Sequence, residues 1–205
     1  MTQINDEFNW DTYTSDLYEK EIRNSGFDME IMSFSIENDD MVFKDNIHLN
    51  HRELYYQIYK LGVKSVYECG FGCGMHLINI HKINPDININ GCDYLKSQLD
   101  FGVRFLNIDK YDFYNKLEIK DFSIPISDNL PKYDFVFSHA VTMHLSDSKA
   151  ITFINNMKLI SNKYVFLIEN IKQHDYDDIF KKTFYDYDRI NTSKYINNGI
   201  LFIKK

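Results

Sequence analysis

A turn with three glycines at alternate positions, set between a strand-like run and a helix-like run, limits what this chain can fold into more than any other feature. The segment reads Val66-Tyr67-Glu68-Cys69-Gly70-Phe71-Gly72-Cys73-Gly74. Glycines let the backbone turn sharply and let a ligand approach closely, because no Cβ stands in the way. The helix that follows begins with free N–H groups and a partial positive charge, which suits a carboxylate or a phosphate. The segment therefore predicts a ligand-binding turn between a strand and a helix.

Helix-like and strand-like segments alternate along the rest of the chain. Helices are predicted at residues 51–61, 75–83, 95–106 and 149–160, and strands at residues 64–68, 87–93, 117–122, 133–138 and 164–169. Such alternation predicts an α/β fold, with a parallel sheet and helices on both faces. The end of the chain differs, because residues 184–190 and 200–204 are strand-like and are joined through the turn element Asn197-Asn198-Gly199. An antiparallel hairpin that finishes the sheet is the simplest account.

The first 50 residues are expected to form a helical cap or extension, and residues 51–205 to form the domain itself. Apolar side chains recur at roughly helical spacing in the first part, at Phe8, Trp10, Tyr13, Leu17 and Tyr18. A 3.6-residue period indicates that one helix face is buried. It fits a helix packed on the domain and also a cap over an active site, so both interpretations stay open.

Composition and charge narrow the class of protein. The chain has 205 residues, a formal net charge of −7 and 44% apolar residues, which fits one globular domain with a real core. The negative balance argues against a surface that neutralises nucleic-acid phosphates or anionic lipid. Three cysteines without a pattern suit a reducing compartment, and neither a secretory signal nor an apolar run of about 20 residues is visible. We therefore expect a cytoplasmic monomer or homodimer without a nucleic-acid or membrane partner.

Three ligands compete for the glycine turn. A P-loop needs Gly-Lys-Ser/Thr after the glycines, and that sequence is missing. A dinucleotide fingerprint needs its third glycine one position later, where Met75 stands, and it rarely carries an acid before the first glycine, where Glu68 stands. An acid suits a ligand with an ammonium or sulfonium group better than one with a pyrophosphate. This favours S-adenosylmethionine.

Residues 68–74 resemble the first motif of class I S-adenosylmethionine-dependent methyltransferases, and the likeness continues in order over residues 50–205. The chain is most similar to small bacterial sugar O-methyltransferases of the capsule or O-antigen type. The resemblance implies a single-domain, Rossmann-like, doubly wound sheet. In the family, an acid placed like Asp93 binds both ribose hydroxyls, and residues placed like Asp121 and Phe122 contact the adenine. The implied cofactor-binding set is Glu68, Gly70, Gly72, Gly74, Asp93, Tyr94, Asp121, Phe122 and Ser138.

The family places its catalytic groups where the fourth strand ends, and here that exit carries His139 and His144. An alcohol is a poor nucleophile until a base takes its proton, and histidine is the usual base near neutral pH. We expect His139 to act as that base, with His144 as the second candidate. The substrate-binding candidates are His48, His51 and Tyr55, from the segment before the first strand, and Asn170, after the fifth.

Several sequences of related enzyme classes are absent. The exit after residue 138 lacks the Asn/Asp-Pro-Pro-Tyr type sequence of DNA and amide methylases, and the chain has no Pro-Cys pair. Catechol-type enzymes hold Mg²⁺ with an Asp at this exit and an Asp-Asn after the next strand. This chain offers only half of that set, in Glu169 and Asn170, so we expect no metal. The acidic run at residues 174–178 is interpreted as the first turn of a helix.

These features together predict an S-adenosylmethionine-dependent methyltransferase that modifies a hydroxyl of a small polar metabolite. The preferred acceptor is a sugar, free or nucleotide-linked, and this step rests on the resemblance. Two alternatives remain. One is methylation of a nitrogen or carboxylate on another small molecule, and the other is a non-catalytic partner subunit that keeps the fold.

Overall fold

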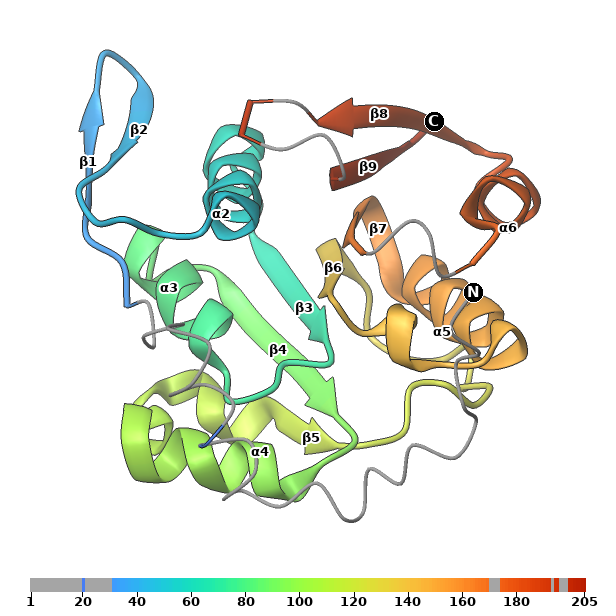
Figure 1. The fold of residues 1–205 in the computed structure, drawn as a ribbon, viewed down its shortest axis with the longest axis horizontal. Coiled ribbons are helices and arrows are strands. Elements are labelled where there is room, and N and C mark those ends of the chain that lie inside the picture. The colour runs from blue at the N-terminus through green and yellow to red at the C-terminus, as the bar shows by residue number, and fades with distance from the viewer. Residues whose placement is uncertain (1–19, 21–30, 170–173, 193, 196–198) are drawn as a thin grey trace.

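A computed structural model of the chain describes residues 20, 31–169, 174–192, 194–195 and 199–205. A seven-stranded sheet forms its centre (Figure 1), and the strand order is β5-β4-β3-β6-β7-β9-β8. The strands are β3 (Ser65–Cys69), β4 (Asn88–Asp93), β5 (Leu117–Ile119), β6 (Tyr133–His139), β7 (Ser161–Ile168), β8 (Tyr187–Thr192) and β9 (Gly199–Lys204).

The strand directions confirm the predicted topology. Strands β3 to β7 pair in parallel, whereas β9 runs antiparallel to both of its neighbours, β7 and β8. From β3 the chain proceeds outward through β4 to β5, and it then returns to the other side of β3 to form β6 and β7. The direction of winding therefore reverses between β3 and β6. In open α/β sheets, ligands bind beyond the carboxyl ends of the strands at such a reversal.

Helices cover both faces of this sheet, as predicted (Figure 1). Their bounds are α2 (Leu49–Leu61), α3 (Met75–Ile83), α4 (Lys96–Phe101), α5 (Asp147–Ile160) and α6 (Tyr176–Thr183). Successive residues of a strand point to opposite faces. Thus Phe135 and Phe137 enter the apolar core under α2 and α3, while Val136 between them enters the core under α5 and α6. Each strand at the centre is consequently buried on both sides.

The predicted helix at residues 95–106 does not continue as one α-helix. It ends at Phe101, and the next turn, Gly102–Leu106, is a π-helix. Gly102 lies against the glycine turn, because a Cβ built on it would stand 2.2 Å from the carbonyl oxygen of Cys73. Close packing between the two segments accompanies the change of helix type. The first turn of α6 begins at the acidic run as predicted, with the Asp175 side chain accepting from Asp178 N.

The described part of the N-terminal segment contains a β-hairpin where the sequence favours a helix. Strands β1 (Phe34–Glu37) and β2 (Asp40–Phe43) pair as an antiparallel ribbon beside α2. The two residues between them, Asn38 and Asp39, have φ values of 51° and 59°. Asparagine and aspartate tolerate this left-handed conformation, which two-residue hairpin turns require. The aromatic stripe at residues 8–18 lies outside the described residues.

Two expectations from composition also concern the described residues. Among their helices, none has both the length and the apolar character needed to cross a membrane. All three cysteines, Cys69, Cys73 and Cys92, are buried and form no disulfide.

Candidate active site

Three polar residues stand on one face of the sheet where strands β3, β4 and β6 end. Glu68 and His139 follow the core residues Val66 and Phe137 by two positions, and Asp93 follows the core residue Ile89 by four, all of them in the core under α2 and α3. Because side chains alternate along a strand, all three point to the α2 and α3 side. They therefore surround the reversal of winding between β3 and β6, where the sequence predicts the ligand.

The glycine turn after β3 is required by the protein's own packing as well as by any ligand. Gly70, Gly72 and Gly74 have φ values of 80°, 58° and 79°, in the left-handed region that favours glycine. A Cβ on Gly70 would lie 2.4 Å from Val141 Cγ2, and one on Gly74 would lie 2.0 Å from Ile108 Cδ1. The absence of side chains at these two positions thus lets the turn pack against the exit of β6 and against residue 108.

Glu68 is a buried carboxyl group with one oxygen that lacks a partner. Its side chain is 1% exposed, and Oε2 has no hydrogen-bond partner in the part of the chain that the structure describes. Its side chain packs beside Gly91, where a Cβ would lie 3.6 Å from the Glu68 Cβ. Burial, and then the negative charge of Asp93, raises the pKa of Glu68 well above its usual range. A buried polar atom without a partner marks a place where a ligand atom is favoured.

Asp93 ties the end of β4 to the glycine turn. Its Oδ2 accepts from Gly72 N at 2.8 Å, and its Oδ1 accepts from Leu95 N at 2.8 Å. Burial raises the pKa of this carboxyl to about 6, against these hydrogen bonds. A carboxylate offers about four acceptor positions, so Asp93 keeps capacity for further donors. The neighbouring Tyr94 is 50% exposed.

The other predicted cofactor residues occupy different surroundings. Asp121 Oδ1 accepts from the backbone and the hydroxyl of Ser123, at 2.8 and 2.6 Å. Phe122 is buried in the core under α5 and α6, where its ring meets those of Tyr67 and Phe153. Ser138 is buried, and its hydroxyl donates to Glu169 Oε1 at 3.1 Å.

Glu169, which follows β7, is a second buried carboxyl group at this end of the sheet. Its Oε1 accepts from Val141 N at 3.2 Å, and its Oε2 has no hydrogen-bond partner among the described residues. Burial raises the pKa of Glu169 above its usual value. The backbone between β6 and this contact is strained, because Ala140 has a φ of 57°. Asn170, a predicted substrate residue, lies outside the described residues.

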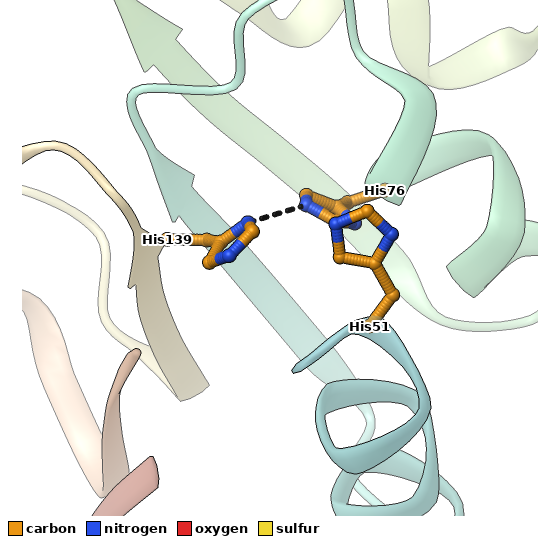
Figure 2. Close-up of side chains that lie close together, drawn as sticks. All are labelled: His51, His76 and His139. Carbon is orange, nitrogen blue, oxygen red and sulfur yellow. Dashed lines mark hydrogen bonds between the residues drawn. The ribbon is translucent and has the colours of Figure 1, made fainter. Parts of the chain in front are cut away.

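Three histidines from separate elements converge near the end of β6 (Figure 2). His51 comes from the first turn of α2, His76 from the first turn of α3, and His139 from the end of β6. A ring nitrogen from each lies within 4.8 Å of those of the other two. His76 Nε2 and His139 Nδ1 lie 3.2 Å apart. The His51 ring stands 4.7 Å from that of His76 and 5.1 Å from that of His139, between ring centres.

A polar layer between α2 and α3 holds His76 in place. Its Nδ1 lies 2.8 Å from the hydroxyl of Tyr55, and Asn79 Nδ2 donates to the same hydroxyl at 2.8 Å. His51 and Tyr55 are four residues apart on α2, and His76 and Asn79 are three apart on α3, so each pair shares one helix face. Tyr55 and Asn79 are fully buried, with 0% of their surface exposed.

The imidazoles of the cluster are neutral near pH 7. Burial, followed by the nearby charge of His48, lowers the pKa of His51 to about 4. Burial, followed by the charges of His51 and His48, lowers the pKa of His139 to about 3, and burial lowers that of His76 well below its usual value. Neutral rings have lone pairs available to accept a proton or to bind a metal ion.

The two remaining histidine candidates lie at the edge of this arrangement or outside it. His48 is exposed and caps α2, with its Nδ1 accepting from Asn50 N at 3.3 Å, and its ring is 5.6 Å from that of His51. His144 is exposed on a short 3₁₀ turn and does not belong to the cluster. Sequence reasoning missed His76, although its position in the first helical turn after the glycines is a usable signal.

Solved methyltransferase structures share this fold. Magnesium protoporphyrin IX methyltransferase from Synechocystis PCC 6803, with bound S-adenosylmethionine, is 13% identical, covers 93% of this chain and 97% of its own, and gives a TM-score of 0.59. A putative O-methyltransferase from Nostoc punctiforme PCC 73102 is 14% identical. The match covers 76% of this chain and 56% of that one, with a TM-score of 0.58. The plantazolicin methyltransferase BpumL, in complex with a monoazolic desmethylPZN analogue and S-adenosylhomocysteine, is 11% identical; the match covers 77% of this chain and 83% of that one, with a TM-score of 0.56.

The likeness to these proteins is found by comparing structures and not by comparing sequences. No protein-family model and no curated protein matches the chain. The chain nevertheless has the Rossmann-like fold of S-adenosylmethionine-dependent methyltransferases, including the antiparallel strand near the end of the sheet.

Proposed function

We propose that the protein is an S-adenosylmethionine-dependent methyltransferase that modifies a hydroxyl group of a small polar metabolite. One observation carries the proposal: Glu68 and Asp93 are buried side by side on the same face, at the reversal of winding and next to the glycine turn. Two buried acids disfavour each other's ionised form. A ligand that presents a cation to one of them and hydroxyl groups to the other relieves this.

The residues present fit the cofactor. Glu68, with its buried Oε2, suits the ammonium of the amino-acid end, since a cation there would lower its raised pKa again. Asp93, with acceptor capacity left, suits the ribose hydroxyls. The backbone N–H of Gly72, in the glycine turn, donates to Asp93 at 2.8 Å. When bound, S-adenosylmethionine supplies an electrophilic methyl group on its sulfonium.

On the acceptor side, His139 is the candidate to take the hydroxyl proton. It stands at the end of β6, on the same face as both acids, and it is partly exposed. A pKa of about 3 keeps its imidazole neutral and ready to accept a proton, but also makes it a weak base. His144 is exposed and outside the cluster, so His139 takes precedence for this role. In its simplest form the mechanism needs no metal.

The acceptor proposed is a sugar, free or nucleotide-linked. This follows from the resemblance to compact sugar O-methyltransferases. Among the structural neighbours, the named acceptors differ widely in chemistry: one enzyme is named for magnesium protoporphyrin IX, and another was crystallised with a monoazolic plantazolicin analogue. Fold does not determine the acceptor.

The proposal is tested in two steps. Calorimetry with S-adenosylhomocysteine, S-adenosylmethionine and NADH comes first, and micromolar binding of the first two with no binding of NADH is expected. Binding of NADH alone would replace the proposal by the dinucleotide alternative. Mass spectrometry of nucleotide sugars incubated with enzyme and S-adenosylmethionine comes second, and the gain of one methyl group on a sugar hydroxyl is expected. Methylation of a nitrogen or carboxylate instead would show that the enzyme is an N- or carboxyl-methyltransferase.

A further inference from the structure

We propose that His51, His76 and His139 together bind one divalent transition-metal ion of the zinc class, at the edge of the cofactor crevice. The sequence predicts no metal here, because the family's Mg²⁺ set is incomplete. The binding site itself stands on the geometry of the three histidines. Its part in catalysis rests on the function proposed above.

The spacing of the ring nitrogens fits ligands of one ion. Zn–N bonds of about 2.0–2.1 Å at tetrahedral angles place two ligand nitrogens roughly 3.3 Å apart. His76 Nε2 and His139 Nδ1 are 3.2 Å apart, and one ring nitrogen from each of the three histidines lies within 4.8 Å of those of the other two. The rings are roughly perpendicular where His51 meets the other two, at 83° and 90° (Figure 2).

The surroundings of His76 are those of a metal ligand. A ligating histidine almost always uses its second ring nitrogen for a hydrogen bond, which fixes the tautomer and the ring orientation. His76 Nδ1 makes such a bond with the Tyr55 hydroxyl at 2.8 Å, and Asn79 in turn donates to that hydroxyl. Asn79 Oδ1 also accepts from Met32 N at 2.9 Å, which anchors the amide. The ligand nitrogen of His76 is thereby aimed at the other two histidines.

The donor set selects the kind of ion. The cluster consists of three imidazoles and contains no carboxylate. Mg²⁺ and Ca²⁺ prefer oxygen ligands, whereas imidazole suits zinc, iron, nickel and copper. Three protein ligands with a fourth position open is the arrangement of catalytic zinc sites. His51 and His76 are buried, and His139 is the partly exposed member of the cluster.

An ion at this position would strengthen the weakest part of the proposed mechanism. It would lower the pKa of an acceptor hydroxyl, so that the reaction would no longer depend on His139, a weak base, to remove the hydroxyl proton. His139 is then a ligand instead of the base, and the hydroxyl proton leaves to solvent. The methyl transfer itself is unchanged: the sulfur–methyl bond breaks as the oxygen–methyl bond forms, and the electron pair stays on sulfur.

A chain of hydrogen bonds without an ion is the rival explanation. The same contacts would let a proton pass between His139 and Tyr55 through His76. Asn50 Nδ2 lies 3.5 Å from His139 Nε2 and would extend such a chain toward the exposed end of α2. A relay predicts no stoichiometric affinity for zinc or cobalt, so metal binding separates the two explanations.

Metal binding is measured directly on the whole protein. The tag-free chain is treated with a chelator, dialysed, shown to be folded by circular dichroism, and titrated with Zn²⁺ by calorimetry and with Co²⁺ by visible absorption. We expect one equivalent per chain and a Co²⁺ spectrum with nitrogen ligands. Folded protein that takes up clearly less than one equivalent of either ion overturns the proposal.

Variants locate the site. Removing a ligand exceeds the 10–100-fold loss typical of outer-shell changes, so His76→Ala and His139→Ala should each lower Zn²⁺ affinity by more than about 100-fold. Tyr55→Phe should lower it by about 10-fold. His144→Ala is the matched control, because it removes an exposed histidine outside the cluster. Equal affinity in His139→Ala and His144→Ala overturns the proposal, even if His76→Ala fails to fold.

Failure of this proposal and failure of the proposed function give different results. Calorimetry with S-adenosylhomocysteine is repeated on the metal-free and the zinc-loaded protein. Cofactor binding without metal binding overturns the metal site and leaves the methyltransferase proposal standing. Metal binding without cofactor binding supports the site and overturns the methyltransferase proposal.

Discussion

Glu68 and Asp93 end neighbouring parallel strands on the same face of the sheet, and their carboxyl groups interact. Burial raises the pKa of Glu68, and the negative charge of Asp93 raises it further. Asp93 is stabilised in part by backbone N–H groups, one of them from Gly72 in the glycine turn, yet burial still raises its pKa to about 6. Two buried acids that repel each other are unfavourable in their ionised forms unless a ligand compensates them. The predictions that follow examine this pair, the histidines beside it and the packing that shapes the crevice.

Replacing Asp93 by alanine should weaken binding of S-adenosylhomocysteine. If the carboxylate accepts from the ribose hydroxyls, its loss removes hydrogen bonds to a charged group, and about 1.5–3 kcal/mol of binding free energy with them. Calorimetry should therefore show a roughly 10- to 150-fold higher Kd. Asp86→Ala, which changes an exposed acid in the turn before β4, is the matched control. An unchanged Kd in Asp93→Ala would remove Asp93 from the ribose role.

The raised pKa of Asp93 should also appear in stability. The folded chain holds the proton of this carboxyl up to about pH 6, whereas the unfolded chain releases it near 3.8. Because the folded state binds more protons in that window, stability from this group is present below pH 3.8 and is lost as the pH rises to about 6. Asp93→Asn cannot ionise. Its stability relative to the natural protein should therefore rise by up to about 3 kcal/mol between pH 4 and pH 7, measured by denaturant unfolding.

The control for this prediction is the exposed acid in the turn before β4. Asp86→Asn should change stability by a similar small amount at both pH values, because this side chain is exposed to solvent. A difference between Asp93→Asn and the natural protein that does not vary with pH would show that Asp93 titrates normally when the chain is folded.

His139 should matter for turnover and little for the cofactor. Whether it takes the hydroxyl proton or holds an ion, it acts on the acceptor, so His139→Ala should lower kcat by roughly 100-fold or more. The affinity for S-adenosylhomocysteine should stay nearly the same. Kinetics and calorimetry on the same preparation measure both quantities. Parallel loss of turnover and of cofactor affinity would mean that His139 supports the structure only.

Local patterns in the sequence predict most of this site, whereas contacts between distant elements do not. The strand, the glycine turn and Asp93 belong to one continuous unit, so spacing alone places them. His76 belongs to a layer that exists only once α2 packs on α3, and its partner Tyr55 lies 21 residues earlier in the chain. The alternation of Phe137 and His139 does predict which face His139 occupies. It does not predict which side chains of α2 and α3 lie beside His139.

The N-terminal hairpin was missed for a different reason. Aromatic and charged residues up to residue 41 fit a helix as well as a strand, so the period of the pattern does not decide. The turn chemistry does decide, because Asn38 and Asp39 both adopt positive φ. Asparagine and aspartate adopt the left-handed region more readily than other residues with a side chain, so this pair is a usable but weaker signal for a two-residue turn than a pair with glycine.

Tyr55 should stabilise the fold through its hydroxyl. In Tyr55→Phe, His76 Nδ1 and Asn79 Nδ2 lose their common partner while still buried. Removing a hydrogen-bond partner from buried polar groups costs about 1–3 kcal/mol, and denaturant unfolding of the metal-free protein should show a loss in this range. Tyr59→Phe, one turn later on α2 and partly buried, should change stability by no more than about 0.5 kcal/mol. Similar small losses in both variants would mean that the polar layer contributes little.

Replacing Gly102 by alanine should destabilise the fold, because Gly102 packs against the backbone of Cys73. Its φ is −59°, which alanine adopts freely, so any loss in Gly102→Ala comes from the Cβ itself. That atom would stand 2.2 Å from the carbonyl oxygen of Cys73, and a backbone group cannot turn aside as a side chain can. We expect a loss of about 1–3 kcal/mol or more in unfolding free energy. Cofactor affinity should fall as well, because Cys73 belongs to the glycine turn.

Gly62→Ala is the matched control for Gly102→Ala: nothing lies within 4 Å of the added Cβ, and only the positive φ of 56° disfavours alanine there. It should lose about 1 kcal/mol and leave cofactor affinity unchanged. Equal effects of the two variants on cofactor affinity would show that Gly102 does not shape the turn.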